Sequence, residues 1–213
     1  MKVKKLDVLL YAITDRGALH GRDICKAVED AIKGGATIIQ LREKGIDEDS
    51  LVEEAKKLKE ICAEYGVPLI VNDNVDAALR AGADGVHVGI EDTPVAEIRE
   101  RVGEDFIIGA TAKTVEQAKK AQAAGADYLG VGAVFPSPTK KDAIRITNEQ
   151  LRDIADAVDI PVAAIGGISR DNIMQLRGSG ADGAAVVSAV FGQEDITEAS
   201  KELRKLAEEM TAL

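Results

Sequence analysis

Apolar residues recur along the chain with two alternating periods, which predict a regular exchange of strands and helices. Short runs rich in β-branched residues, such as 37–42 and 162–165, are typical of buried strands. Longer segments with apolar residues three or four positions apart, such as 47–65, predict amphipathic helices. The predicted strands are 8–14, 37–42, 67–72, 85–89, 106–111, 128–134, 162–165 and 184–187. The predicted helices are 21–33, 47–65, 75–81, 94–102, 114–124, 148–158, 171–177 and 195–210.

A short repeat supports this count of strands and helices. Gly-Ala-Thr or Gly-Ala-Asp stands between a helix and a strand at 35–37, 82–84, 125–127 and 180–182. Each glycine can end its helix in a left-handed conformation, so that the next strand starts at once. The repeat divides the chain into four strand–helix–strand–helix units. Four such units predict a single (β/α)8 TIM barrel over residues 1–213. A doubly wound sheet is the alternative, but eight even units favour a closed barrel.

Composition narrows the class of protein. Hydrophobic residues make up 46% of the 213 residues and aromatic residues only 3%, which predicts an aliphatic core. The net charge of −10 argues against nucleic acid or an anionic membrane as the main partner. Cys25 and Cys62 are isolated thiols in helical patterns, and no apolar run reaches transmembrane length. These features predict a cytoplasmic protein.

Polar and cationic side chains follow the second predicted strand. Gln40, Arg42 and Lys44 share one face of this strand because successive side chains alternate. Such a strand end is well placed to hold an anion. It is equally compatible with a strand that frays into a solvated loop, and this segment alone leaves both interpretations open.

Two carboxylates follow the neighbouring strands. Asp73 comes directly after the third strand, and Asp92 follows the fourth. In a barrel these ends are adjacent, so the two carboxylates can converge near Arg42 and Lys44. Two carboxylates beside cationic side chains indicate Mg²⁺ bridging a polyphosphate.

Further candidates stand at the remaining strand ends. Thr111 ends the fifth strand, and the loop 135–142 combines prolines, hydroxyl groups and lysines. Gly166 and Gly167 follow the seventh strand, where backbone N–H groups could approach a phosphate, and Ser188 follows the eighth. Each of these segments alone would be an ordinary turn. His87 lies inside the fourth strand and is expected to be a core histidine with satisfied hydrogen bonds.

Six motifs together resemble the thiamine-phosphate synthase family. They are Gln-Leu-Arg-Glu-Lys at 40–44, Val-Asn-Asp at 71–73, His-Val-Gly-Ile-Glu-Asp at 87–92, Ser-Pro-Thr-Lys-Lys at 137–141, Ile-Gly-Gly-Ile at 165–168 and Val-Ser at 187–188. The resemblance covers nearly the whole chain. It implies that hydroxymethylpyrimidine diphosphate is joined to a thiazole phosphate, giving thiamine phosphate and pyrophosphate. In that mechanism pyrophosphate leaves first, and the thiazole nitrogen captures the resulting pyrimidine-methylene cation.

The resemblance also implies residue roles. The pyrimidine diphosphate site would comprise Gln40, Arg42, Glu43, Lys44, Asn72, Thr111 and Lys140. Within it, charge on the leaving group would be neutralised by Arg42, Lys44 and Lys140. Mg²⁺ would be bound by Asp73 and Asp92. The thiazole phosphate would be held by Ser137, Pro138, Thr139, Gly166 or Gly167, Val187 and Ser188. The family usually has Gln, Ser and often His where Ile90, Thr111 and Lys113 stand, so Ile90 and Lys113 receive no role.

Three other functions compete with synthesis. A thiazole tautomerase shares the barrel but tends to lack the diphosphate-binding residues that are intact here. A metal-dependent sugar-phosphate epimerase could use His87 and Asp73, but it would not need Arg42 and Lys44 together. A non-catalytic ligand sensor is the third alternative, and no DNA-binding appendage supports it.

Overall fold

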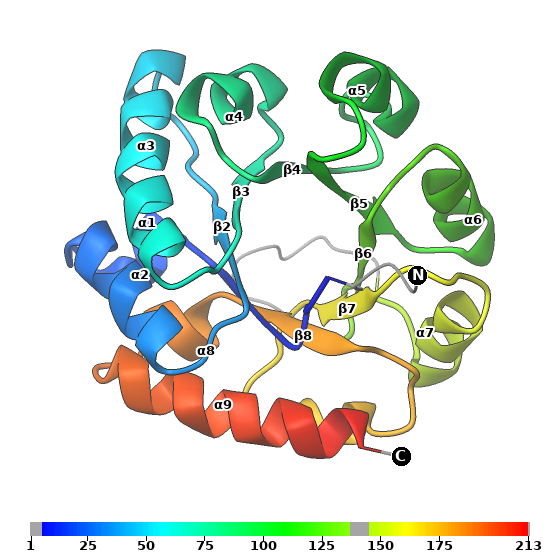
Figure 1. Ribbon diagram of the computed structural model, residues 1–213. Coiled ribbons are helices and arrows are strands. Elements are labelled where there is room, and N and C mark those ends of the chain that lie inside the picture. The colour runs from blue at the N-terminus through cyan, green and yellow to red at the C-terminus, as the bar shows by residue number, and fades with distance from the viewer. Residues whose placement is uncertain (1–5, 137–144, 213) are drawn as a thin grey trace.

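The computed structural model describes residues 6–136 and 145–212 and shows a closed barrel of eight parallel strands ringed by helices (Figure 1). Neighbouring strands pair in chain order, and the last pairs with the first, Leu10 opposite Ala184. The predicted (β/α)8 TIM barrel is confirmed. The strands are β1 (Leu10–Ile13), β2 (Ile38–Leu41), β3 (Leu69–Asn72), β4 (Gly85–Val88), β5 (Ile107–Ala112), β6 (Tyr128–Gly132), β7 (Val162–Ile165) and β8 (Gly183–Val186).

The helices agree with the sequence pattern except where they are very short. They are α1 (Arg16–Leu19), α2 (Ile24–Lys33), α3 (Glu48–Glu64), α4 (Val75–Ala81), α5 (Val95–Val102), α6 (Val115–Ala123), α7 (Asn148–Ala155), η1 (Ile173–Leu176), α8 (Ser188–Phe191) and α9 (Ile196–Thr211). Helices α1 and α8 were not predicted, because a single turn contains no apolar period. The α-helix predicted over 171–177 is wrong in type, since η1 is a four-residue 3-10 helix.

Helix ends follow the expected local chemistry. Thr114 caps the N-terminus of α6, where its hydroxyl accepts the Gln117 backbone N–H. The glycines of the repeat all have positive φ, namely Gly35 (105°), Gly82 (66°), Gly125 (98°) and Gly180 (77°). These glycines allow the chain to reverse from each helix into the next strand, which explains the repeat.

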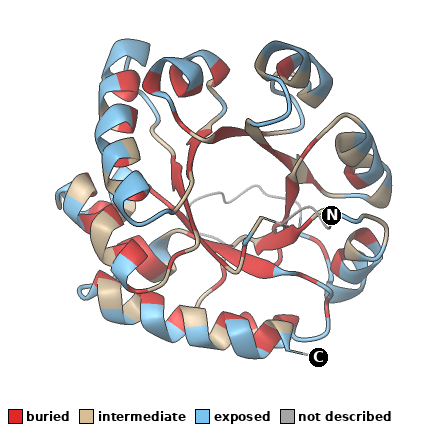
Figure 2. Cartoon of the chain, viewed as in Figure 1, coloured by how far each residue is buried: buried red, intermediate tan, exposed pale blue. Residues whose placement is uncertain are grey.

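Buried residues form two layers, one inside the barrel and one between strands and helices (Figure 2). Alternation along β2 shows how they divide: Ile38 belongs to the inner layer, whereas Ile39 and Leu41 belong to the outer one. Gln40 shares the inner face with Ile38 and is only 2% exposed. The inner face of β2 therefore turns polar towards its C-terminal end, as its sequence predicts.

The inner layer has little spare room around its aromatic side chains. A Cβ on Gly109 would lie 2.1 Å from Tyr128 Cζ and 2.5 Å from His87 Nδ1. We therefore expect Gly109→Ala to lower the free energy of unfolding by about 1–3 kcal/mol, as overpacking of a core does. Urea denaturation would measure this loss. Gly17→Ala is the control, because its Cβ would meet only the Asp15 carboxylate, at 3.0 Å. Unchanged stability in Gly109→Ala would show that the interior can rearrange.

Candidate active site

The predicted site residues gather at one mouth of the barrel. Because every strand is parallel, the C-terminal ends of β2, β3, β4, β5, β7 and β8 share a single rim. The rim carries Gln40, Arg42, Lys44, Asn72, Asp73, Asp92, Thr111, Gly166, Gly167, Val187 and Ser188. Four predicted residues, Ser137, Pro138, Thr139 and Lys140, lie outside the described residues.

Arg42 is held between the ends of β1 and β2. Its backbone N–H donates to Thr14 Oγ1 at 3.0 Å, and its Nη1 donates to Asp15 Oδ2 at 2.9 Å. The two paired side chains are 20% and 23% exposed. Asp15 is itself fixed, because its other carboxylate oxygen accepts the Ala18 N–H at the start of α1. The ion pair uses one edge of the guanidinium and leaves other N–H donors for a ligand.

Asp73 and Asp92 form a close carboxylate pair. Burial, together with the charge of Asp92 and a hydrogen bond between the two groups, raises the pKa of Asp73. A hydrogen bond from Asn72 and the charge of Lys44 oppose this increase in pKa. Asp92 is anchored because its Oδ2 accepts the Gly89 N–H at 2.7 Å. The structure thus brings Lys44, Asn72, Asp73 and Asp92 together, as the sequence predicts.

The donor set at this pair suits a hard cation that keeps other ligands. No cluster of three or more His, Cys, Asp or Glu side chains suited to a metal occurs within 6–136 and 145–212. Mg²⁺ is commonly bound by only one or two carboxylates, with waters and substrate phosphates completing its octahedron. Asp73 and Asp92 fit that pattern, and a cation between them would offset the repulsion that raises the pKa of Asp73.

Glu43 lies apart from the other members of its motif. Its Oε2 accepts from Arg16 Nε at 2.7 Å, and Arg16 Nη2 donates to Glu54 at 2.6 Å. The Glu43 side chain is 1% exposed, and burial raises its pKa. The structure therefore does not bring this carboxylate to the diphosphate residues, in contrast to the expectation from the motif. Chain alternation explains the difference, since Arg42 and Lys44 flank Glu43 on the opposite face.

The glycine pair after β7 packs closely against the neighbouring loop. Gly166 and Gly167 have φ of 107° and 63°, and a Cβ on Gly167 would lie 2.1 Å from the Pro136 carbonyl oxygen. The Phe135 N–H donates to the Gly166 carbonyl at 2.9 Å. Among the backbone bonds between described residues, none uses the N–H of Gly166 or Gly167 as donor. No described backbone carbonyl therefore occupies these two N–H groups.

The sequence of this chain is similar to a known protein family over most of its length. The family described as "Thiamine monophosphate synthase" matches residues 10–190. The chain belongs to this family. The thiamine-phosphate synthase of Clostridium tetani is 49% identical over 203 residues, covering 95% of this chain and 97% of that protein. The thiamine-phosphate synthase of Alkaliphilus oremlandii is 49% identical over 199 residues, covering 93% and 95%.

Solved structures agree with this family assignment. Thiamine phosphate pyrophosphorylase from Pyrococcus furiosus superposes with a TM-score of 0.88 at 43% identity, covering 97% of this chain and 98% of that chain. A 3-hexulose-6-phosphate synthase superposes with a TM-score of 0.64 at 16% identity, which shows a shared barrel alone. Within the described ranges, no helix combines the length and apolar character needed to cross a membrane.

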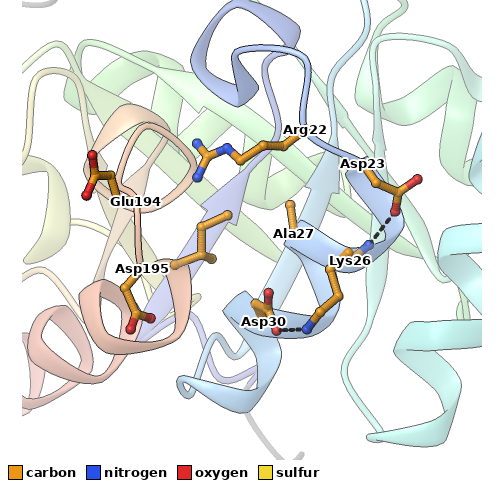
Figure 3. Close-up of a pocket in the computed structure, with 8 residues that line it drawn as sticks. Arg22, Asp23, Lys26, Ala27, Asp30, Glu194 and Asp195 are labelled. Carbon is orange, nitrogen blue, oxygen red and sulfur yellow. Dashed lines mark hydrogen bonds and ion pairs between the residues drawn. The ribbon is translucent and has the colours of Figure 1, made fainter.

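A separate hollow on the outside of the barrel contains none of the predicted site residues. It lies between α2 and the segment leading into α9 (Figure 3). Its charges are largely satisfied by the protein, because Lys26 pairs with Asp30 and Arg22 donates to the Phe191 and Gln193 carbonyls.

Two structural features of the candidate site were not predicted from the sequence. Asp15 holds Arg42, and its only sequence signal is its position just after the first strand. Tyr11 and Tyr128 lie inside the barrel and join their hydroxyl groups at 2.6 Å, directly beneath the rim residue Gln40. Both contacts cross between strands, so they depend on the three-dimensional register.

Proposed function

We propose that this chain joins hydroxymethylpyrimidine diphosphate to a thiazole phosphate, forming thiamine phosphate and releasing pyrophosphate. The observation that carries the proposal is that the cations Arg42 and Lys44 and the carboxylate pair of Asp73 and Asp92 follow three neighbouring strands, β2, β3 and β4, and that the charge of Lys44 acts on Asp73. This arrangement suits a magnesium-bound diphosphate leaving group. Membership of the synthase family supports the same reaction.

The proposed reaction needs charge neutralisation more than a protein nucleophile. The bond between the pyrimidine methylene carbon and the diphosphate oxygen breaks, and its electron pair leaves with the oxygen. The lone pair of the thiazole nitrogen then forms the new carbon–nitrogen bond. Negative charge grows on the diphosphate during the first step, so cations placed around it lower the barrier. We assign this role to Arg42, which Asp15 aligns, and to Lys44, whose charge acts on Asp73.

Asp73 and Asp92 would hold Mg²⁺, which supplies further positive charge to the diphosphate when bound. The protein side of this site is preorganised. The Gly89 N–H fixes Asp92, and a hydrogen bond from Asn72 and the charge of Lys44 act on Asp73. The role of Lys140, drawn from the family resemblance, is part of the proposal. So is a cytoplasmic location, to which the two free cysteines are suited.

The second phosphate is proposed to bind at the ends of β7 and β8. We expect Ser188→Asp to raise KM for the thiazole phosphate more than tenfold, because a carboxylate placed there repels an anion by an amount on the order of 1.4 kcal/mol or more. KM for the pyrimidine diphosphate serves as the internal control and should change much less. Steady-state kinetics with each substrate varied in turn would measure both constants. Equal increases would contradict separate phosphate sites. Gly167→Val would be a poorer probe, because its side chain would collide with the Pro136 backbone.

A reconstituted reaction tests the proposed function. The purified protein, Mg²⁺ and both phosphorylated substrates should yield thiamine phosphate and pyrophosphate in equal amounts. Omission of either substrate should abolish both products. Interconversion of thiazole isomers without joining would favour the tautomerase alternative instead. Binding of both substrates without turnover would favour a ligand sensor.

A further inference from the structure

Five polar side chains inside the barrel form an unbroken chain of hydrogen bonds. Gln40 Nε2 donates to the Tyr11 hydroxyl, which lies 2.6 Å from the Tyr128 hydroxyl. The Tyr128 hydroxyl lies 3.1 Å from His87 Nδ1, and His87 Nε2 lies 3.1 Å from Thr111 Oγ1. The five residues come from five different strands, β2, β1, β6, β4 and β5. The chain of bonds therefore joins two rim residues, Gln40 and Thr111, through the barrel interior.

The interior is shaped to hold this hydrogen-bond chain. Tyr128 and Tyr11 are at most 1% exposed, and His87 is 8% exposed. Gly109 and Gly130 leave the space that the His87 ring occupies, since a Cβ on Gly130 would already lie 3.0 Å from His87 Cε1. The two tyrosine rings meet edge to face with centroids 5.6 Å apart. These groups have no alternative partner in water, so their hydrogen bonds are strongly favoured.

The direction of one bond fixes the direction of all the others, because each hydroxyl group has one proton. Since Gln40 donates to Tyr11, Tyr11 donates to Tyr128, and Tyr128 donates to Nδ1 of His87. The single proton of a neutral imidazole then lies on Nε2 and is donated to Thr111. The ring is only 8% exposed, and both of its nitrogens are bonded to hydroxyl groups and not to a carboxylate, so the neutral imidazole is the favoured form. The opposite direction would require the proton of His87 on Nδ1.

The direction of these hydrogen bonds determines which polar groups Gln40 and Thr111 present to a ligand. Among described residues, Gln40 Oε1 has no hydrogen-bond donor, so it is left as an acceptor. Thr111 Oγ1 receives the His87 proton, so its own hydroxyl proton is left to be donated. An aminopyrimidine carries N–H groups on its amino substituent and lone pairs on its ring nitrogens. Gln40 Oε1, as a fixed acceptor, complements the amino N–H groups, and the Thr111 hydroxyl, as a fixed donor, complements a ring nitrogen.

We propose that Tyr11, Tyr128 and His87 are positioning residues that hold Gln40 as an acceptor and Thr111 as a donor for the pyrimidine ring of the substrate. The identity of this ring rests on the proposed function. The direction of the hydrogen-bond chain does not rest on the proposed function, and it can be tested in the absence of turnover.

The protonation of His87 is the direct test of direction. The chain has only two histidines, so comparison with the His20→Gln variant assigns the ¹⁵N NMR signals of His87. We expect Nε2 of His87 to be protonated and Nδ1 unprotonated at neutral pH. In Tyr128→Phe, which lacks the hydroxyl, this preference for one tautomer should be lost. Protonation on Nδ1, or a rapidly exchanging mixture in the unaltered protein, would overturn the proposal.

Kinetics then tests the positioning role. We expect Tyr128→Phe to raise KM for the pyrimidine diphosphate about tenfold, the effect of one lost hydrogen bond in a buried network. KM for the thiazole phosphate should not change. Tyr65→Phe is the matched control, because Tyr65 is 40% exposed and donates to Glu29 outside the barrel. Equal increases in both KM values would indicate a merely structural role. If Tyr128→Phe fails to fold, Tyr11→Phe provides the same comparison.

The two tests separate this proposal from the proposed function. The expected His87 tautomer in a protein that forms no thiamine phosphate would contradict the function and leave the direction of the chain intact. Turnover with the opposite tautomer would contradict the direction alone.

Discussion

Arg42→Lys should lower kcat by roughly 30- to 1,000-fold, corresponding to a loss of about 2–4 kcal/mol of transition-state stabilisation. The guanidinium can bind Asp15 with one edge and diphosphate oxygens with its other N–H groups, whereas a lysine ammonium cannot reproduce this geometry. The contact strengthens as charge grows on the leaving group, so the loss should appear in kcat. KM for the thiazole phosphate should change much less. Steady-state kinetics would measure these constants.

Arg101→Lys is a suitable control for this substitution. Arg101 is 42% exposed and pairs with Asp76 on the outer helices, so its replacement should leave kcat and stability unchanged. Urea denaturation should also show little change for Arg42→Lys, because Arg42 lies on a partly exposed strand end. A kcat near that of the unaltered protein, or a variant that mainly unfolds, would assign Arg42 a structural role.

Removal of one carboxylate from the Asp73–Asp92 pair should abolish turnover while the fold survives. Asp73 has a φ of 63°, in the left-handed region that asparagine tolerates better than alanine. Asp73→Asn is therefore the sharper variant, since Asp73→Ala would add backbone strain of roughly 1–2 kcal/mol. Neutralising this carboxylate removes an anionic ligand from the proposed Mg²⁺ site. Product formation and circular dichroism together would measure the outcome.

Chelation provides an independent test of the same site. EDTA should stop product formation in the unaltered protein, and excess Mg²⁺ should restore it. Asp76→Asn, which alters an exposed carboxylate on α4, should behave like the unaltered protein. Full activity in EDTA, or full activity in Asp73→Asn, would exclude the proposed metal site.

The barrel could be predicted from the sequence because its signals are local. The positive-φ glycines of the repeat, such as Gly82 and Gly180, separate helices from strands at regular intervals. The strand 162–165 and the helix 75–81 agree with β7 and α4 to the residue. Helices α1 and α8 could not be predicted in this way, since four residues contain too few positions to show a period.

Side-chain alternation predicted part of the site correctly. It placed Gln40 on the inner face of β2, and adjacent strand ends brought Asp73 towards Asp92. Glu43 was assigned from its place in a contiguous motif, whereas alternation alone would have separated it from Arg42. Gly167 shows a different limit of prediction from the sequence. Close packing against Pro136 requires glycine at this position, and a backbone that approaches a phosphate would favour glycine as well. The residue type alone therefore does not distinguish the two roles.

Contacts between distant strands could not be predicted from one sequence. Tyr11 and Tyr128 are 117 positions apart, and their hydrogen bond depends on the curvature and register of the closed barrel. The same holds for Asp15 and Arg42, which meet because β1 and β2 end side by side. Such pairs align or position residues that belong to sequence motifs. The motifs themselves do not indicate which residues form these pairs.

A crystal structure of the protein with Mg²⁺, pyrophosphate and thiamine phosphate would show directly where the metal and the phosphate groups bind. We expect Mg²⁺ between Asp73 and Asp92, and pyrophosphate in contact with Arg42 and Lys44. We also expect the phosphate of thiamine phosphate at the ends of β7 and β8. Pyrophosphate bound away from Arg42 and Lys44, or a metal that does not touch Asp73 and Asp92, would contradict this placement of the active site.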